Sequence, residues 1–208
     1  MPENVPERGD LIRLVERAQG KDREGFHALY NLYARPIFNF ILRLIGSAED
    51  AEDLTQETFL KAFHELARLR DPGQFKFWLY RIARNEVYQR LRRLKRKTEV
   101  SIDDEVAGYY NFLPSENQGL SPEDSLLNQE LEKHIQLALD AMPVKLRDVF
   151  VLAVVQKFSY EEVTQIVGRS ILSVKTDIYR ARLIAKDVLG RYLEKSTDEV
   201  PRRRKRNS

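Results

Sequence analysis

Apolar residues recur at every third or fourth position through most of the chain, a spacing that predicts amphipathic α-helices rather than strands. The clearest stripe runs through residues 22–45 and comprises Phe26, Leu29, Tyr30, Tyr33, Ile37, Phe40, Ile41, Leu44 and Ile45. Gly46 is expected to end this helix, and Pro36 to kink or break it. A shorter helix is predicted over residues 10–19, where Gly20 ends it.

Cap residues mark two further helices in this half of the chain. Ser47, with an acid at the third helical position in Asp50, predicts the start of a helix that continues to about Arg68. Asp71-Pro72 opens the next helix, which should be established by about Gln74. Residues 74–107 contain no proline or glycine, so no breaker ends that helix early.

A second helical unit follows a break in composition. The stretch TEVSIDDEVAGYYNFLPSENQGLSPED, from residue 98, is acidic, has two glycines and two prolines, and is predicted to be a linker. Ser121-Pro122 then starts a helix with the stripe Leu126, Leu127, Leu131, Ile135, Ala138, Leu139 and Met142. Pro143 begins another, with Leu146, Val149, Phe150 and Ala153.

The predicted fold class is therefore all-α, with two small helical domains joined by an acidic flexible linker. We expect the following division: an N-terminal segment with the first helix over 1–21, a first domain over 22–97, the linker over 98–125, a second domain over 126–195 and a basic disordered tail over 196–208.

Charge is distributed unevenly, although the net charge of the chain is only +3. Residues 68–97 contain eleven Lys or Arg against two acids, a net charge of +9, whereas residues 98–132 contain nine acids and no Lys or Arg, a net charge of −9. Such blocks are usually solvated faces or tails. When they alternate along a chain, they indicate polyanion binding and its control.

Cysteine is absent, which excludes a disulfide framework, a cysteine zinc site and a thiol nucleophile. The N-terminus lacks the apolar core of a signal peptide, and the longest apolar run, at 149–155, is far too short to span a bilayer. We expect a soluble, cytoplasmic protein that uses no cofactor or metal and does not insert into a membrane.

Residues 159–182 have the pattern of a helix-turn-helix. Ser159 and Glu162 form a capping box, Gly168 provides the left-handed turn and Ser170 caps the second helix. Donors and a basic pair suited to base edges and phosphates in a major groove are expected to point outward from that helix: Ser173, Lys175, Thr176, Tyr179 and Arg180. The alternative is an ordinary antiparallel helix pair with a solvated basic face.

The segment FKFWLYRIARNEVYQRLRRLKRK (75–97) mixes five aromatic residues with nine Lys or Arg. On a helical projection one face is aliphatic, and Trp78 flanks it and is expected to be buried. The other face is expected to point outward and carries Phe77, Arg81, Arg84, Tyr88, Arg92 and Lys95, with Tyr80 and Asn85 beside it. Rings that stack on unpaired bases and cations that neutralise phosphates suit single-stranded nucleic acid, the alternative being a solvated basic side.

Acidic residues cluster after Ser47: Glu49, Asp50, Glu52, Asp53 and Glu57. None of these acids has a histidine at Glu-x-x-His spacing, so a metal site is not expected here. The carboxylates either complement the helix dipole or form a docking face, because Asp53, Gln56 and Glu57 can share one side of the helix. No Gly-rich phosphate loop, G-x-S-x-G or Ser/His/Asp arrangement is visible, so no catalytic residue is predicted.

In chain order, DREGFHALYNLYARPIFNFILRLIG, DAEDLTQETFLKAF, FKFWLYRIARNEVYQRLRR and a helix-turn-helix ending in R-A-R resemble a bacterial RNA polymerase sigma factor. More narrowly, they resemble the extracytoplasmic-function (ECF) group of the sigma-70 family. The resemblance spans roughly residues 10–97 and 126–193, and D-L-x-Q-E-x-F followed by W-L-x-x-I-A-x-N is its most specific part. The short linker also fits, since larger sigma factors carry an additional domain there.

The resemblance implies an alternative sigma factor, not an enzyme, that binds core RNA polymerase, directs it to promoters and promotes DNA melting. In the first, sigma-2-like domain, Asp53, Gln56 and Glu57 would contact the coiled coil of the polymerase β′ subunit. The −10 element would be bound by Tyr80, Arg81, Arg84, Asn85, Tyr88 and Arg92, with residues 69–74 as the wall of a pocket for a flipped base near Asn85.

The second, sigma-4-like domain would pack on the polymerase β flap. It would read the −35 element through Ser173, Lys175, Thr176, Tyr179 and Arg180. An anti-sigma protein that covers both domains is also implied as a partner.

Three positions depart from the family pattern. Asp177 stands where a basic residue is common, Leu172 where glycine is frequent, and Thr164 where alanine is usual. An acid near phosphates would repel them, and the effect of Asp177 and Leu172 on recognition of the −35 element is open.

Two roles are open for the acidic linker: it could occupy a basic channel of polymerase as an RNA mimic, or fold back over the basic helix. Two competing functions are also open. One is a regulator that binds duplex DNA without polymerase, and the other is a nucleic-acid enzyme that uses the acidic cluster.

Overall fold

The structure is a computed structural model that describes residues 7–100 and 132–198, with side chains over 7–96 and 132–191. Within these ranges every regular element is a helix, which confirms the all-α prediction. The predicted linker lies outside the described residues except for residues 98–100, which are helical, so neither role considered for it is addressed. The basic tail likewise lies outside them from residue 199 on.

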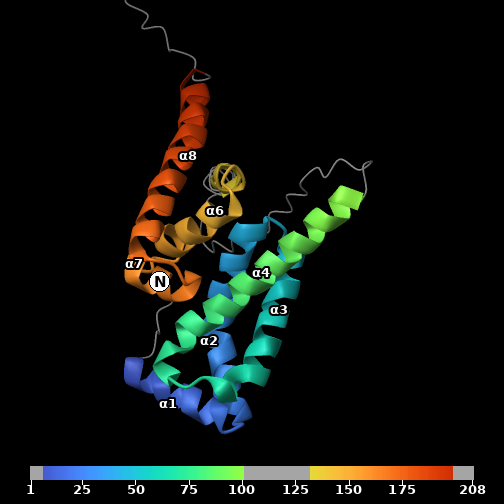
Figure 1. Cartoon of the computed structure of the whole chain (residues 1–208), viewed down its shortest axis with the longest axis vertical. Coiled ribbons are helices and arrows are strands. Elements are labelled where there is room, and N and C mark those ends of the chain that lie inside the picture. The colour runs from blue at the N-terminus through green and yellow to red at the C-terminus, as the bar shows by residue number, and fades with distance from the viewer. Residues whose placement is uncertain (1–6, 101–131, 199–208) are drawn as a thin grey trace, which may run out of the picture.

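The first half of the chain forms four helices and two short 3₁₀ turns: α1 (Arg8–Gln19), α2 (Arg23–Ile45), α3 (Ala48–Glu65), η1 (Leu66–Arg68), η2 (Pro72–Gln74) and α4 (Phe75–Val100). Figure 1 shows α2, α3 and α4 side by side, with α1 crossing one end of the group. Residues 22–97, predicted as the first domain, thus form the three longest helices of this half together with the two turns.

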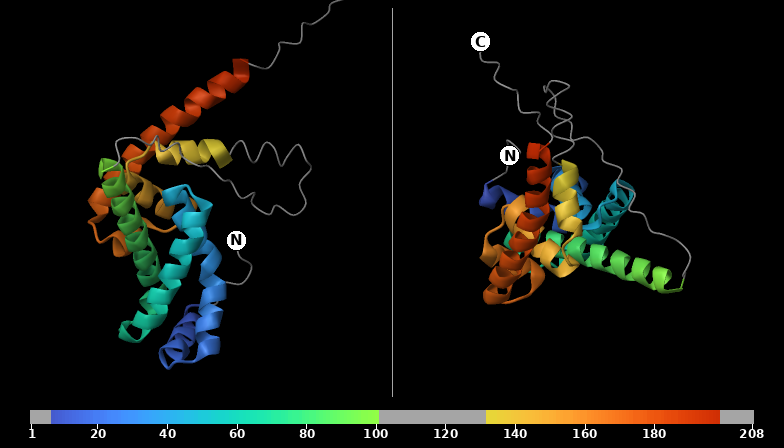
Figure 2. Two further views of the ribbon diagram at one scale, coloured as in Figure 1. Left: turned by 90° about the vertical axis from the view of Figure 1, so that its right-hand side faces the viewer. Right: turned by 90° about the horizontal axis from the view of Figure 1, so that it is seen from above.

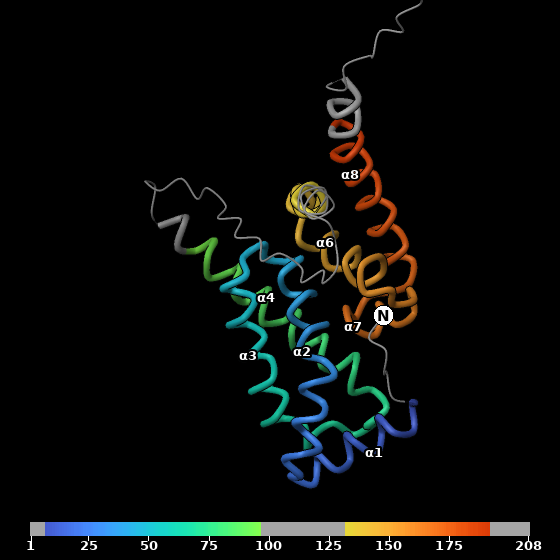
Figure 3. Tube along the Cα trace, turned by 180° about the vertical axis from the view of Figure 1, so that it is seen from behind, coloured from blue at the N-terminus to red at the C-terminus, as the bar shows by residue number. Residues whose placement is uncertain are grey.

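The second half contains a helix over residues 132–140, then α6 (Val144–Phe150), the π-helical turn η3 (Val151–Val155), α7 (Tyr160–Val167) and α8 (Ile171–Asp198). The left view of Figure 2 shows α8 extending away from the body of the molecule. The tube in Figure 3 shows α7 beside the N-terminal half of α4, and the two helices are in contact.

Local sequence signals account for the helix ends. The Asp22 carboxylate accepts the Glu24 N–H and caps α2, and the Ser47 hydroxyl accepts the Asp50 N–H and caps α3. Gly46 has φ 77°, a left-handed conformation that ends α2 with little steric cost. Pro36 does not break α2, which continues through it to Ile45.

The core is continuous between the two halves. Phe40 of α2, Tyr80 of α4 and Phe158, which precedes α7, form a row of edge-to-face rings with centroids 5.2 and 4.9 Å apart. The buried apolar residues of both halves belong to one cluster. The second half is therefore packed onto α2 and α4 in this structure. Among the helices described, none combines the length and the apolarity that a bilayer crossing requires.

Candidate nucleic-acid interface

The acidic face of α3 is exposed, as its helical spacing predicts. Asp53, Gln56 and Glu57 all lie on the solvent side of the helix. Arg90 of α4 lies beside the N-terminal part of this face and pairs with Asp50 at 2.9 Å and with Asp53 at 3.7 Å. Among the described residues, no group of three or more His, Cys, Asp or Glu has a geometry that could hold a metal ion.

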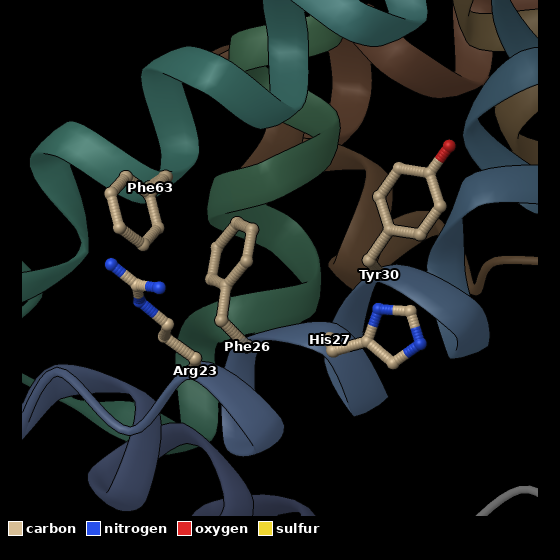
Figure 4. Close-up of a pocket in the computed structure, with 5 residues that line it drawn as sticks. All are labelled: Arg23, Phe26, His27, Tyr30 and Phe63. Atoms are coloured by element: carbon tan, nitrogen blue, oxygen red, sulfur yellow. The ribbon is translucent and has the colours of Figure 1, made fainter.

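Apolar side chains continue this face along α3. Leu60 is 61% exposed and Phe63 52% exposed, unusually high fractions for large apolar residues. Phe63 borders an open hollow of about 440 Å³ between α2 and α3, lined by Arg23, Phe26, His27, Tyr30 and Phe63. Figure 4 shows Arg23 reaching toward the ring of Phe63. The α3 surface is thus acidic at one end and aromatic at the other.

The outward face predicted for α4 is instead partly covered by the second half of the chain. Tyr80 is buried, and its hydroxyl donates to Gln156 Oε1 at 2.9 Å. Arg81 donates to the backbone carbonyl of Gln165 at 2.5 Å. Of the six α4 residues predicted to bind the −10 element, Arg81, Asn85 and Arg92 are exposed. Trp78, predicted to be buried, is half-buried against Phe75.

A buried carboxylate explains where Arg84 and Tyr88 point. Asp148 of α6 is completely buried, and its Oδ2 accepts Arg84 Nε at 2.6 Å and the Tyr88 hydroxyl at 2.8 Å. The other carboxylate oxygen accepts Arg169 at 3.2 Å. The Arg84 guanidinium also stacks over the Tyr88 ring at 4.4 Å. Burial, and then the negative charge of Asp148, raise the pKa of Tyr88. The Tyr88 hydroxyl therefore stays protonated and can donate its hydrogen bond to Asp148.

Residues 69–74, predicted as a pocket wall, form a turn that is stabilised by a side chain of α1 and by an internal cap. Gln19 of α1 donates its amide to the carbonyls of Leu66 and Leu69, at 3.1 and 2.7 Å. Asp71 caps η2 by accepting the Gly73 N–H at 2.9 Å. The Gln19 contact therefore ties the turn to α1, and on α4 Arg81, Asn85 and Arg92 of the predicted −10 set remain exposed.

The helix-turn-helix forms as its sequence predicts. Ser159 and Glu162 complete a reciprocal capping box at α7, and Gly168 adopts φ 67° in the turn before α8. Val174 and Ile178 of α8 are buried. Lys175, Thr176, Tyr179 and Arg180 are exposed on α8, whereas Ser173 is half-buried. All five predicted −35 residues thus lie on α8, and four of them are exposed.

We expect Ser159→Ala to lower the free energy of unfolding by about 1 kcal/mol, because it leaves the Glu162 N–H without its cap. Urea unfolding followed by circular dichroism measures this change. Ser159→Thr is the matched control, since it keeps a capping hydroxyl. Equal stability of the Ala and Thr variants would show that the cap contributes nothing.

Asp177 is buried and paired within the second domain, which corrects the expected repulsion at this position. Its side chain is 5% exposed and pairs with Arg169 and, at 3.6 Å, with Lys145. Arg169 lies in the turn just before α8, so the carboxylate fixes the turn to the helix. Leu172, the other departure on this helix, is 73% exposed in the first turn of α8. Thr164 of α7 donates its hydroxyl to the Glu161 carbonyl at 2.6 Å.

Sequence reasoning missed three charged residues that organise the second half. Asp148 and Arg169 form the network described above. Arg147 is buried and donates to the carbonyl of Leu44 at 2.7 Å, which joins α6 to the end of α2. All three stand in or beside strongly apolar stretches, and a charge in such a position indicates a buried partner.

Fold and surfaces together define a helical DNA-binding protein with a helix-turn-helix and a second, aromatic and basic helix. Two family models match the chain: Sigma-70 region 2 over residues 29–97 and Sigma-70, region 4 over residues 133–183. The ECF RNA polymerase sigma factor SigW of Bacillus subtilis is 31% identical over 177 residues, which cover 83% of this chain and 92% of SigW. The RNA polymerase sigma-H factor of Pseudomonas aeruginosa is 31% identical over 171 residues, covering 82% and 89%.

Solved structures show the same relationship. The sigma factor RpoE of Bartonella quintana, in complex with the anti-sigma factor NepR, superposes with a TM-score of 0.63 at 26% identity, covering 79% of this chain and 96% of RpoE. The chain belongs to the ECF group of the sigma-70 family. It is therefore a transcription initiation factor that binds core RNA polymerase and directs it to promoter DNA.

Proposed function

We propose that three surfaces divide the work of promoter recognition. Asp53, Gln56 and Glu57 on α3 dock on core RNA polymerase, on the coiled coil of its β′ subunit. The aromatic and basic face of α4 binds the non-template strand of the opened −10 element. Exposed side chains of α8 read the duplex −35 element, while the second domain rests on the β flap. The observation that carries this assignment is the exposed acidic row of α3 in the same domain as the aromatic and basic face of α4.

The −10 role follows from the chemistry of α4. Tyr88, and Tyr80 once Phe158 no longer covers it, offer rings on which unpaired bases can stack. Arg81, Arg84 and Arg92 offer cations for phosphates. Asn85 is exposed and offers both a donor and an acceptor to a base edge. Flipping a base costs a few kcal/mol, which these contacts offset.

The −35 role rests on α8. Lys175 and Arg180 are exposed cations for phosphates, and Ser173, Thr176 and Tyr179 offer hydroxyls near base edges. Thr176 donates its hydroxyl to the Leu172 carbonyl at 2.9 Å, which leaves its methyl group for apolar contact with a thymine. We propose that residues 22–97 and 126–195 are the two domains that carry these roles.

We further propose that the chain is not itself an enzyme, acts in the cytoplasm and is held inactive by an anti-sigma protein. Support for the last point is the RpoE structure, in which a sigma factor with this fold is bound to an anti-sigma factor.

Reconstitution with core RNA polymerase tests the function as a whole. The purified chain is expected to confer promoter-specific initiation on the core enzyme, and 5′ ends of transcripts from genomic templates would map the promoters. Specific duplex binding by the chain alone, with no effect on core polymerase, would instead identify a conventional regulator. Divalent-metal-dependent turnover of nucleic acid would identify an enzyme.

Asn85→Ala is expected to reduce promoter melting about tenfold, because one amide contact to a base edge is worth about 1–3 kcal/mol. Permanganate reactivity of unpaired thymines on the mapped promoter measures melting. Asn31→Ala is the control, since Asn31 is also exposed but lies on α2. Unchanged reactivity in Asn85→Ala, with normal binding to core polymerase, would remove Asn85 from the −10 site.

A further inference from the structure

One carboxylate occupies the centre of the surface proposed for the −10 strand. Asp148 belongs to the second domain, yet Arg84 and Tyr88 of α4 both donate to its Oδ2 atom. The Asp148 side chain has no solvent exposure, whereas the side chains of Arg84 and Arg169 are 17% and 18% exposed. A buried anion is thus held by two guanidinium groups and a phenol.

This set of donors is the one that a DNA phosphate requires. Arginine recognises carboxylates and phosphates with the same geometry of charge-assisted hydrogen bonds. The distances to Asp148, 2.6 and 2.8 Å from α4, are those of strong hydrogen bonds. A phosphate could replace the carboxylate without any rearrangement of the donors on α4, but the two anions cannot occupy the site together.

Neighbouring contacts extend this competition along α4. Tyr80 donates to Gln156, Arg81 donates to the Gln165 carbonyl, and the Lys76 ammonium lies 4.1 Å from the ring centroid of Phe158. All three partners belong to the second domain. The second domain therefore covers Tyr80 completely and occupies part of the binding capacity of Arg81 and Lys76.

We propose that Asp148 is an internal substitute for a backbone phosphate, which holds the second domain on α4 and closes the −10 surface in the free protein. The inference rests on the proposed −10 function of α4. Polymerase and promoter DNA bind the open form, and the closed form lowers the apparent affinity for single-stranded DNA by the fraction of chains that are open.

The test uses the full chain with Asp148→Asn, which removes the charge and nearly preserves the shape. We expect this variant to bind a fluorescent 20-nucleotide DNA single strand of random sequence about tenfold more tightly than the unaltered chain, within the usual range of coupling between sites. Asp177→Asn is the matched control. Asp177 is also buried, but its ion pairs with Arg169 and Lys145 lie within the second domain. Equal tightening in both variants would mean a simple charge effect and would overturn the proposal.

Domain separation is measured independently by energy transfer between dyes. The chain has no cysteine, so cysteines at the exposed positions Glu65 on α3 and Lys186 on α8 can be labelled selectively. Asp148→Asn is expected to lower the transfer efficiency. Unchanged efficiency would overturn the proposal that Asp148 holds the second domain on α4, while leaving the proposed −10 role intact. An open variant that binds DNA no more tightly would instead contradict the −10 role of α4, and the proposal with it.

The unaltered chain provides a measurement that does not depend on a variant folding. Saturation with the same single strand is expected to lower the energy transfer, because DNA and Asp148 compete for Arg84 and Tyr88. Binding of the strand with no change in energy transfer would overturn the proposal.

Discussion

Glu57→Lys is expected to weaken binding of the chain to core RNA polymerase by about 100-fold or more and to abolish promoter-specific transcription. Glu57 is exposed on α3 beside Gln56 and one turn from Asp53, on the proposed docking face. A reversed charge at a complementary interface places like charges together, which costs several kcal/mol. The fold should be unaffected, since substitutions at exposed positions usually change stability by less than about 0.5 kcal/mol.

The measurement is a titration of labelled chain with core polymerase, followed by fluorescence anisotropy at two salt concentrations. Glu16→Lys is the matched control, because Glu16 is exposed on α1 and the substitution changes the net charge by the same amount. Affinity of Glu57→Lys within threefold of the control would exclude this face as the docking site.

Arg90, which pairs with Asp53, supplies a second check. Arg90→Ala should leave binding to core polymerase intact or strengthen it slightly, since it frees the Asp53 carboxylate.

Local features of this molecule were predictable because their causes are local. Ser47, Ser159 and Gly168 act within a few residues of themselves, and each caps or turns the chain as its type predicts. The apolar stripe of α2 depends only on helical periodicity and a buried face. The exposed row on α3 follows from the same periodicity. These signals were sufficient for the fold class and for the helix-turn-helix.

The prediction for α4 failed in one respect, and the reason is a long-range one. A helical projection separates its aliphatic face from its aromatic and basic face, but it does not reveal what covers the second face. The covering group, Asp148, lies 64 residues from Arg84 in the chain. Asp148 lies in the short helix VKLRDVF, which also contains two basic residues. The local sequence therefore does not reveal that its partners are on α4.

Asp177 was misjudged for a related reason. Its position within the recognition helix suggested contact with phosphates, yet a helix of 28 residues has a buried side as well as an exposed one. The neutralising Arg169 lies eight residues earlier, and the turn at Gly168 brings it close. Charge patterns along a sequence do not distinguish an acid that faces DNA from one that is paired inside.

Arg147→Ala is expected to lower the free energy of unfolding by about 3 kcal/mol, because two buried carbonyls lose their donor at about 1–3 kcal/mol each. Arg147 NH1 donates to the Leu44 carbonyl at 2.7 Å and lies 3.0 Å from Asp140 Oδ1. Its NH2 group donates to the carbonyls of Asp140 and Met142, at 3.1 and 3.3 Å. Alanine would leave these buried carbonyls without their donor and remove the packing of the side chain.

Urea unfolding measures the loss, and Arg13→Ala is the control, because the Arg13 side chain is 81% exposed and its nearest carboxylate, on Asp10, is 3.8 Å away. A loss no greater than that of Arg13→Ala would show that solvent replaces the buried contacts.

The position of Arg147 between two helices leads to a second expected result. Since Leu44 is in α2 and Arg147 in α6, the alanine variant should also loosen the second domain from α2, which lowers energy transfer between dyes at Glu65 and Lys186. Arg147 and Asp148 are adjacent in α6 and hold two different helices of the first domain, so loss of either contact is expected to favour the open form.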